Sequence, residues 1–485
     1  MTERKISIDP ITRLEGHGKI EIFLDDDGKP KDAVLQVPEL RGFEEFSRGR
    51  KGEEMPRITE RICGVCPEAH HLASTKALDA AFSAKPPKTA RDLRKLLYNS
   101  YIFADHLLHL FYLGGPDFLV EDGEKAERNI VGVINSLGEE VGKKVLKARR
   151  LGHEAIEIIG GHQVHPVTGV PGGLSQGITS EEREELVSIG ESAVEFAKQA
   201  LELFREKVID TDKFGSLVDN PEFALNSYYM GLIDDRNRVS FYDGDLLVVD
   251  PDGEEFTKTE VSKVLDILEE RVEPWTYVKF PYLKEVGWED FRAGEESGVF
   301  RVGPLARLNV AEGMKTSLAQ EEYERYVDYF DGTPVHQTYA YHWARLIEMI
   351  QAAERIQELA NDEEITGDGI RSSLEEPGEG VGVIEAARGT LIHGYKLDDD
   401  GLVNSANMIV PTTSNSAALS ISIKQAAFSA LEDGMSDEQV LNRVEMGFRP
   451  YDPCLACATH SVDGGLDIGL SIYDSEGELI KEIER

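Results

Sequence analysis

All four cysteines of the chain fall into two pairs with the spacing Cys-x-x-Cys, one pair near each end. Cys63 and Cys66 form the first pair, and Cys454 and Cys457 form the second. Thiolate sulfur is a soft, electron-rich ligand for nickel, iron and zinc, and it can also accept a proton. Four cysteines in 485 residues are too few for a disulfide scaffold, so the pattern points to metal or redox chemistry.

The spacing alone leaves three interpretations open. A structural zinc site uses four thiolates, but its two pairs normally lie close together in the sequence. Here positions 63 and 454 are 391 apart, which suits a metal buried between the two ends of a large domain. A thioredoxin-like redox pair needs a βαβ setting, and neither pair has one. The third interpretation is a catalytic centre whose soft thiolates bind nickel and iron.

The elements that must bring the two pairs together are mostly helical. Period-two alternation over the first forty residues, around a DDDGKP turn, predicts a hairpin. A second hairpin is predicted in SFYDGDLLVVDPDGEEF, and the Gly-rich segment around EAARG is predicted to form strands and turns. The fold class is therefore α+β and mainly helical. Apolar residues at three- and four-residue spacing predict helices at about residues 68–82, 91–113, 126–150, 180–207, 320–330, 336–361, 416–433 and 437–446.

The composition excludes several classes of function. Hydrophobic residues make up 41% of the chain, mean hydropathy is -0.32, and no run of eighteen apolar residues occurs, so no membrane span is expected. The N-terminal residues show no export signal. The formal charge of -38 would repel the phosphates of nucleic acid. It also suggests an origin in a salty cytoplasm as a secondary interpretation, because salt screens such self-repulsion.

The residues around the cysteines decide among these interpretations. The segments RITERICGVCPEAHHLAS and RPYDPCLACATHSV resemble the two signature motifs of [NiFe] hydrogenase large subunits. The resemblance continues through DPITRLEGHGKI, RGFEEF, EAARG and VPTTSN, so it covers essentially the whole chain. It is most similar to the cytoplasmic group 3 type, either non-deazaflavin-reducing (methyl-viologen-reducing) or bidirectional.

The resemblance implies how the cysteines would hold the metals. All four would bind nickel, with Cys63 and Cys454 terminal, while Cys66 and Cys457 would also bridge to an iron that carries CO and two cyanides. The chain would then catalyse the reversible conversion of H2 into two protons and two electrons. H2 is a weak acid, so its cleavage needs an electrophilic metal and a nearby base.

The same resemblance implies roles for residues around the metals. Glu15 would relay protons from a terminal thiolate, although a solvated glutamate on a hairpin is the plain alternative. Arg388 would lie over the open side of the metals, held by Asp105 and Asp452. Without the family pattern these three would be read as a structural salt-bridge group. His70 would form a hydrogen bond near a bridging sulfur, although a lone helical histidine is more often a core residue.

A magnesium site and the pocket for the iron ligands follow in the same way. Glu44, His460 and the backbone carbonyl of Met408 would bind Mg2+, for which oxygen ligands are usual and histidine is an unusual addition. Thr412 would direct its hydroxyl toward one cyanide, and Pro411 would line the iron ligands.

Two features depart from the family pattern. Ala387 stands where the family usually has proline before the arginine, which loosens the local backbone. In addition, residues 461–485 follow His460, and family members normally lose such an extension to a dedicated protease after metal insertion. We therefore expect one catalytic domain over residues 1–460, with a peripheral α+β insertion at about 213–310, and a C-terminal extension cleaved after His460. The alternation in that extension, around its SEGE segment, predicts a hairpin.

The electrons must leave the chain, because one bimetallic site consumes all four cysteines. The resemblance implies that the partner is an iron–sulfur small subunit, joined by further electron-transfer subunits, and that a maturation endopeptidase and metal-insertion proteins act on the chain. The loop with His162 and His165 resembles the contact with the small subunit, although it is equally typical of a simple turn. The sequence lacks a G-x-G-x-x-G motif after a strand, which argues against nucleotide binding of the Rossmann type. The rival interpretations are a H2-sensing subunit, the zinc-binding scaffold and a metal-free relative of a respiratory complex I subunit.

Overall fold

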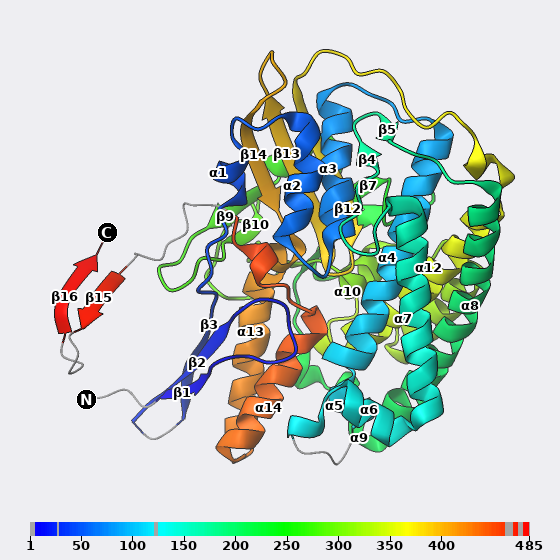
Figure 1. Cartoon of the computed structure of the whole chain (residues 1–485). Coiled ribbons are helices and arrows are strands. Elements are labelled where there is room, and N and C mark those ends of the chain that lie inside the picture. Colours follow the sequence, from blue (N-terminus) through cyan, green and yellow to red (C-terminus); the bar gives the residue numbers. More distant parts are fainter. Residues whose placement is uncertain (1–4, 27–28, 121–124, 461–468, 474–478, 485) are drawn as a thin grey trace.

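The computed structural model describes residues 5–26, 29–120, 125–460, 469–473 and 479–484. The predicted mainly helical α+β fold is confirmed (Figure 1). The two cysteine pairs, far apart in the sequence, meet in the interior between the helices and the sheets. None of the helices in these ranges combines the length and the apolar character that a membrane crossing requires.

A bundle of four long helices forms one side of the molecule (Figure 1). The helices are α4 (Lys88–Leu108), α7 (Glu139–Gly160), α8 (Ser180–Phe204) and α12 (Tyr341–Asn361). Helix α12 packs against both α4 and α8, and it is buried on nearly every face of its first thirteen residues. A helix that is buried on every side belongs in the centre of a bundle, and its buried charged side chains Arg345 and Glu348 have hydrogen-bond partners there. Helices α4 and α8 each continue into one π-helical turn, His109–Leu113 and Arg205–Ile209.

The single helix predicted over residues 126–150 is wrong. Helix α6 (Ile130–Leu137) ends at Gly138, and α7 begins directly after it. Gly138 has a φ of 93°, which a helix cannot contain and which glycine adopts without steric cost. The apolar spacing continues across this break, so periodicity alone could not reveal it.

A three-stranded sheet lies against α3 (Pro67–Ala81), the helix that follows the first cysteine pair. Its strands are β12 (Glu379–Ala386), β13 (Gly389–Leu397) and β14 (Val403–Ile409), in the order β12-β13-β14. Gly380 and Gly382 permit the contact, because a Cβ atom on either would lie 2.2 and 2.3 Å from helix carbonyl oxygens. The Gly-rich composition therefore lets the helix that carries His70 approach the sheet that carries Arg388.

The N-terminal strands form a second sheet, β1 (Lys5–Ile8), β2 (Lys19–Leu24) and β3 (Pro30–Gln36). Strands β2 and β3 pair antiparallel, which confirms the predicted hairpin. Residues 27–28 of its turn lie outside the described residues. The sheet packs against α13 (Pro411–Glu432), which begins five residues before the predicted start at Ser416 because Pro411 opens its first turn.

The middle segment contains mixed short strands, as predicted. Strands β6 (Tyr228–Ile233), β7 (Asp245–Val249), β8 (Glu255–Thr259) and β11 (Phe300–Arg301) form one sheet in the order β11-β6-β7-β8. The pairing of β7 with β8 is the predicted second hairpin. Apolar residues of this sheet share a core with β12, β13 and β14, so the segment is joined closely to the rest of the chain.

The tail contains the predicted hairpin, since β15 (Gly469–Tyr473) pairs antiparallel with β16 (Leu479–Glu484). The SEGE segment between these strands and Ser461 lie outside the described residues. The remaining helices and strands are α1 (Phe43–Ser47), α2 (Met55–Thr59), α5 (Pro116–Leu119), α9 (Asp212–Val218), α10 (Pro304–Val310), α11 (Ser317–Tyr329), α14 (Asp437–Phe448), β4 (Gly169–Val170), β5 (Gly173–Leu174), β9 (Leu268–Arg271) and β10 (Phe280–Leu283). The short 3-10 turns nearest the cysteines are η2 (Glu60–Ile62), η10 (Arg449–Tyr451) and η11 (Ala456–Ala458).

Candidate metal centre

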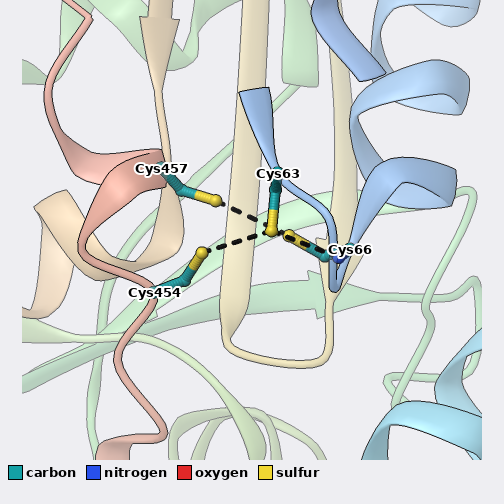
Figure 2. Close-up of side chains that lie close together, drawn as sticks. All are labelled: Cys63, Cys66, Cys454 and Cys457. Carbon is teal, nitrogen blue, oxygen red and sulfur yellow. Dashed lines mark hydrogen bonds between the residues drawn. The ribbon is translucent and has the colours of Figure 1, made fainter. Parts of the chain in front are cut away.

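The four cysteine sulfurs converge on one buried point. They lie within 4.8 Å of one another, and Figure 2 shows that all four side chains point inward. The Sγ atoms of Cys63 and Cys454 are 3.3 Å apart, and those of Cys66 and Cys457 are 3.7 Å apart. Each motif therefore places its first cysteine beside the first of the other motif, and its second beside the second.

The start of α3 shapes the first cysteine pair. Cys66 is the N-cap residue of this helix, and Pro67 occupies its first turn. The backbone N–H groups of Val65 and Cys66 both donate to the Sγ of Cys63, at 3.2 and 3.3 Å. Free N–H groups at a helix start favour negative charge nearby, so the local backbone supports a thiolate at this point.

The ionisation of the sulfurs fits a cation among them. Burial raises the pKa of Cys454 and of Cys457 well above the usual value. Burial also acts to raise the pKa of Cys63, but hydrogen bonds from the other three thiols and the charge of Arg388 lower it well below that value. Without a metal only one thiolate is favoured here, whereas a bound cation would let all four ionise. The donor set thus suits soft transition metals.

Glu15 joins the N-terminal segment to the second cysteine pair. Its carboxylate Oε2 accepts from the Cys454 thiol at 2.9 Å and from the Ala456 N–H at 3.2 Å. Its carbonyl oxygen accepts from the Leu455 N–H at 2.8 Å. Burial, followed by the charge of Cys63, raises the pKa of Glu15. A carboxyl group with a raised pKa beside a thiol can exchange a proton with it near neutral pH.

Glycine makes this approach of the two segments possible. Gly16 has a φ of 87°, and a Cβ atom there would lie 2.5 Å from the backbone nitrogen of Ala456. A Cβ atom on Gly18 would lie 2.4 Å from the Leu455 side chain. The two glycines of the TRLEGHGKI segment therefore allow Glu15 to lie against the cysteine loop.

Arg388 is 4% exposed and lies between two buried carboxylates. One guanidinium nitrogen donates to Asp105 at 2.9 Å, and another lies 3.0 Å from Asp452. Burial alone would lower the pKa of Arg388, but Asp105, Asp452 and nearby cysteines raise it well above its usual value. Burial raises the pKa of Asp452 to about 6. The arginine is thus held as a cation beside the sulfur cluster.

His70 takes part in a chain of buried hydrogen bonds. Its Nδ1 lies 3.1 Å from the Nε2 of His393, whose Nδ1 lies 2.8 Å from the hydroxyl of Tyr395. That hydroxyl donates to Ser74 at 3.0 Å. Burial lowers the pKa of His70 to about 4, so its ring is neutral at pH 7.

The three residues expected at a magnesium site lie together. The Met408 N–H donates to the Glu44 carboxylate at 2.8 Å, and the Glu44 N–H donates to the carbonyl of His460 at 3.4 Å. Both ring nitrogens of His460 are buried without a hydrogen-bond partner among the described residues. Burial lowers its pKa to about 3. A neutral imidazole whose two nitrogens have no hydrogen-bond partner in the described part of the chain has the chemistry of a metal ligand.

The residues expected to line the iron ligands lie at the start of α13, and the two histidines expected at the partner contact lie in a surface loop. The Thr412 hydroxyl lies in the first turn of α13 and accepts from the Cys454 N–H at 3.0 Å, so its own proton points elsewhere. Pro411 is buried beside it. His162 is exposed and His165 is half-buried in the loop after α7, a place compatible with either a turn or a partner contact.

Sequence reasoning missed several buried groups of this region. His393 and Tyr395 stand on β13, far from the first motif in sequence, and no local pattern marks them as partners of His70. Glu68, two residues after Cys66, is 3% exposed, and burial raises its pKa well above the usual value. The sequence signal that could have identified Glu68 is its position inside the first cysteine motif, where an ionisable residue is a candidate for function.

The chain is similar to known proteins over nearly its whole length, including the residues of the metal centre. A family model described as nickel-dependent hydrogenase matches residues 41–129 and 233–460, and a model described as HoxL-like matches residues 5–40. The chain is 45% identical to an iron-sulfur subunit of the F420-non-reducing hydrogenase of Archaeoglobus profundus, over 99% of each chain. It is 38% identical to the beta subunit of the NAD-reducing hydrogenase HoxS of Cupriavidus necator, over 99% of this chain and all of that one. A solved NAD+-reducing [NiFe]-hydrogenase superposes with a TM-score of 0.88 and 37% identity, covering 94% of this chain and 99% of the other.

Proposed function

The chain belongs to the nickel-dependent hydrogenase family as a large subunit, and on that premise we propose that its four cysteines hold a thiolate-bridged Ni–Fe(CN)2(CO) centre. The observation that carries the proposal is the convergence of four buried sulfurs from the two ends of the chain. Bound there, the metals supply the electrophile that makes H2 acidic enough for a nearby base. The reaction is H2 ⇌ 2H+ + 2e−.

The cysteines divide into two kinds. Cys63 and Cys454 would be terminal ligands of nickel, while Cys66 and Cys457 would also hold the iron. The close approach of Cys63 to Cys454, and of Cys66 to Cys457, supports this division. The contact of Glu15 with Cys454 supports it further, since a proton on a terminal thiolate is the one that must leave.

The surrounding residues handle protons and charge. Glu15 accepts a proton from the Cys454 sulfur and passes it outward. Arg388, fixed by Asp105 and Asp452, presents a cation toward the site where H2 binds and helps to polarise it. His393 fixes the ring of His70, and His70 in turn supports the centre on the side of Cys66.

Two groups complete the centre. Pro411 and Thr412 would line the CO and cyanide ligands of the iron. Glu44, the carbonyl of Met408 and the ring of His460 would hold Mg2+, which would join the last residue of the catalytic domain to β14. The ring nitrogens of His460, for which the described residues offer no hydrogen-bond partner, support this second ion.

The electrons pass to an iron–sulfur small subunit, and the loop with His162 and His165 lies on the contact. Relatives that are named as subunits of larger hydrogenases support this partner, and further electron-transfer subunits complete the assembly. The likeness to F420-non-reducing and NAD-reducing relatives supports a group 3 enzyme of the cytoplasm, with an acceptor other than F420.

Residues 1–460 form the catalytic domain, with the segment at about 213–310 as its peripheral part, and residues 461–485 are removed after metal insertion. The family model ends its match at residue 460, which supports this boundary. A dedicated endopeptidase and metal-insertion proteins carry out the maturation. Mass spectrometry of the mature chain is expected to find His460 at its C-terminus.

An infrared spectrum of the chain, purified with its partner from its native host, tests the centre. We expect sharp CO and cyanide bands that shift under H2, with about one nickel per chain and iron in excess of nickel, because the iron–sulfur partner contributes iron of its own. Zinc in place of nickel, with no such bands, would overturn the proposal. Turnover measured in the same preparation distinguishes an enzyme from a H2 sensor, because a sensor would show the bands but only slow reaction.

A further inference from the structure

Arg388 stands in a two-residue turn. Strand β12 ends at Ala386 and β13 begins at Gly389, so Ala387 and Arg388 form the connection. Neither of these two residues has a positive φ. The hairpin offers no partner to the N–H of its first turn residue, since the hydrogen bond of such a turn uses the N–H of the fourth residue. The Ala387 N–H must therefore find a partner elsewhere.

That partner is Tyr101. The N–H of Ala387 donates to the hydroxyl of Tyr101 at 3.3 Å, and the tyrosine is 2% exposed. Tyr101 and Asp105 are four residues apart on α4, so they share one face of the helix. Asp105 holds the guanidinium of Arg388 at 2.9 Å. One face of one helix thus holds both the backbone and the side chain of this turn.

Other contacts restrain the turn from the remaining directions. Arg307 donates to the carbonyl of Ala386 at 2.9 Å, and Asn415 donates to the carbonyl of Arg388 at 3.4 Å. Gly389 also packs closely against Val302, since a Cβ atom on this glycine would lie 2.3 Å from the Val302 side chain. The Tyr101 hydroxyl supplies the corresponding hydrogen bond on the N–H side of Ala387.

We propose that Tyr101 is a positioning residue for Arg388 and acts through the backbone N–H of Ala387. The proposal rests on the proposed hydrogenase function, because it concerns the arginine assigned to H2 polarisation. Alanine at position 387 creates a buried donor that proline, which has no N–H, would not have. Tyr101 satisfies that donor and replaces the stiffness that a proline would supply.

Four forms of the holoenzyme test the proposal: the natural chain, Tyr101→Phe, Ala387→Pro and the double variant. Tyr101→Phe is expected to lower kcat for H2 about fivefold at unchanged nickel content, because one buried hydrogen bond is lost. Hydrogen exchange at the Ala387 amide is expected to become about tenfold faster. Ala387→Pro in the Tyr101→Phe background is expected to restore kcat to within about twofold, since proline suits the first turn position and leaves no donor unpaired.

Tyr326→Phe is the matched control. Its hydroxyl is buried and has no hydrogen-bond partner among the described residues, so its removal is expected to change neither kcat nor the exchange at Ala387.

Three results would overturn the proposal. The Ala387 amide could exchange rapidly in the natural holoenzyme, Tyr101→Phe could leave both kcat and exchange unchanged, or proline could fail to restore kcat. A nickel-loaded natural chain that does not turn over H2 would instead contradict the proposed function, while its Ala387 exchange would still report on the contact with Tyr101.

Discussion

Glu15 makes contacts of two separable kinds. Its carboxylate accepts from a backbone N–H, which a glutamine would preserve, and from the Cys454 thiol, with which only a carboxyl group can exchange a proton. Glu15→Gln is therefore expected to lower H2-dependent dye reduction about a hundredfold. The nickel content and the melting temperature should stay near those of the natural chain, because the backbone contact remains.

Glu321→Gln serves as the control for this change. That side chain is 60% exposed on α11, and we expect no effect of its replacement on turnover. Dye reduction by Glu15→Gln within about twofold of the natural chain would mean that protons leave by another route.

The residues of the centre differ in how visible they are in the sequence. The four cysteines, Glu15 and Arg388 stand in contiguous motifs, so their types and spacing identify them. His393 faces His70 across 323 positions, and Tyr101 lies in an ordinary helical pattern. Such contacts depend on how helices and strands pack against one another, so they cannot be predicted from a short segment of the sequence.

At the scale of elements, glycine decides where segments can approach. Gly16 has a φ of 87° and Gly49 a φ of 74°, but only a Cβ atom on Gly16 would meet backbone, since nothing lies within 4 Å of one on Gly49. Both alanine variants bear the same cost of a left-handed backbone. Gly16→Ala is expected to lower the melting temperature further than Gly49→Ala does, and to reduce nickel retention as well.

Thermal melting and metal analysis of the two variants check this expectation. Equal losses in both would mean that the loop of Leu455 and Ala456 moves aside at little cost. The approach of Glu15 to that loop would then depend less on the glycine than its geometry suggests.

Buried charge joins three further elements. Arg307 on α10 contacts Glu348 on α12 at 2.5 and 2.6 Å and Glu385 on β12 at 2.7 Å, and all three side chains have no exposed area. Removing the arginine leaves both buried carboxylates without the guanidinium that pairs with them. Arg307→Met is therefore expected to lower the free energy of unfolding by about 3–5 kcal/mol, as measured by urea denaturation.

Arg150 provides the matched comparison on α7. It is 66% exposed and lies 3.4 Å from Glu154, so Arg150→Met is expected to cost less than about 1 kcal/mol. A similar cost at both positions would show that water or local rearrangement compensates the buried carboxylates.

The elements themselves were largely predictable, because helix and strand periods are properties of short segments. The predictions failed where a single residue overrides the period: Gly138 divides a helix, and Pro411 starts one early. The packing of α3 on the sheet could not be foreseen, although its cause, a glycine at positions 380 and 382, is plain in the sequence.

For the molecule as a whole, acidic residues far outnumber basic ones. The formal charge of -38 acts against compactness through self-repulsion. Raising NaCl from about 0.02 to about 0.5 M shortens the Debye length from tens of ångströms to a few, so the melting temperature is expected to rise. Sucrose at matched osmolality is the control, because it favours compact states without screening charge. A melting temperature independent of salt would mean that the surface charges are already compensated.

The contribution of both ends of the chain to one set of sulfurs has a consequence for biosynthesis. A ribosome must make more than nine-tenths of the polypeptide before the third and fourth ligands exist. A product that ends before Cys454 has only two of the four cysteines, even if its bundle of four long helices is folded. A chain that retains nickel has therefore been translated through the second motif. The position of the ligands in this way restricts stable nickel binding to chains that are synthesised past Cys457.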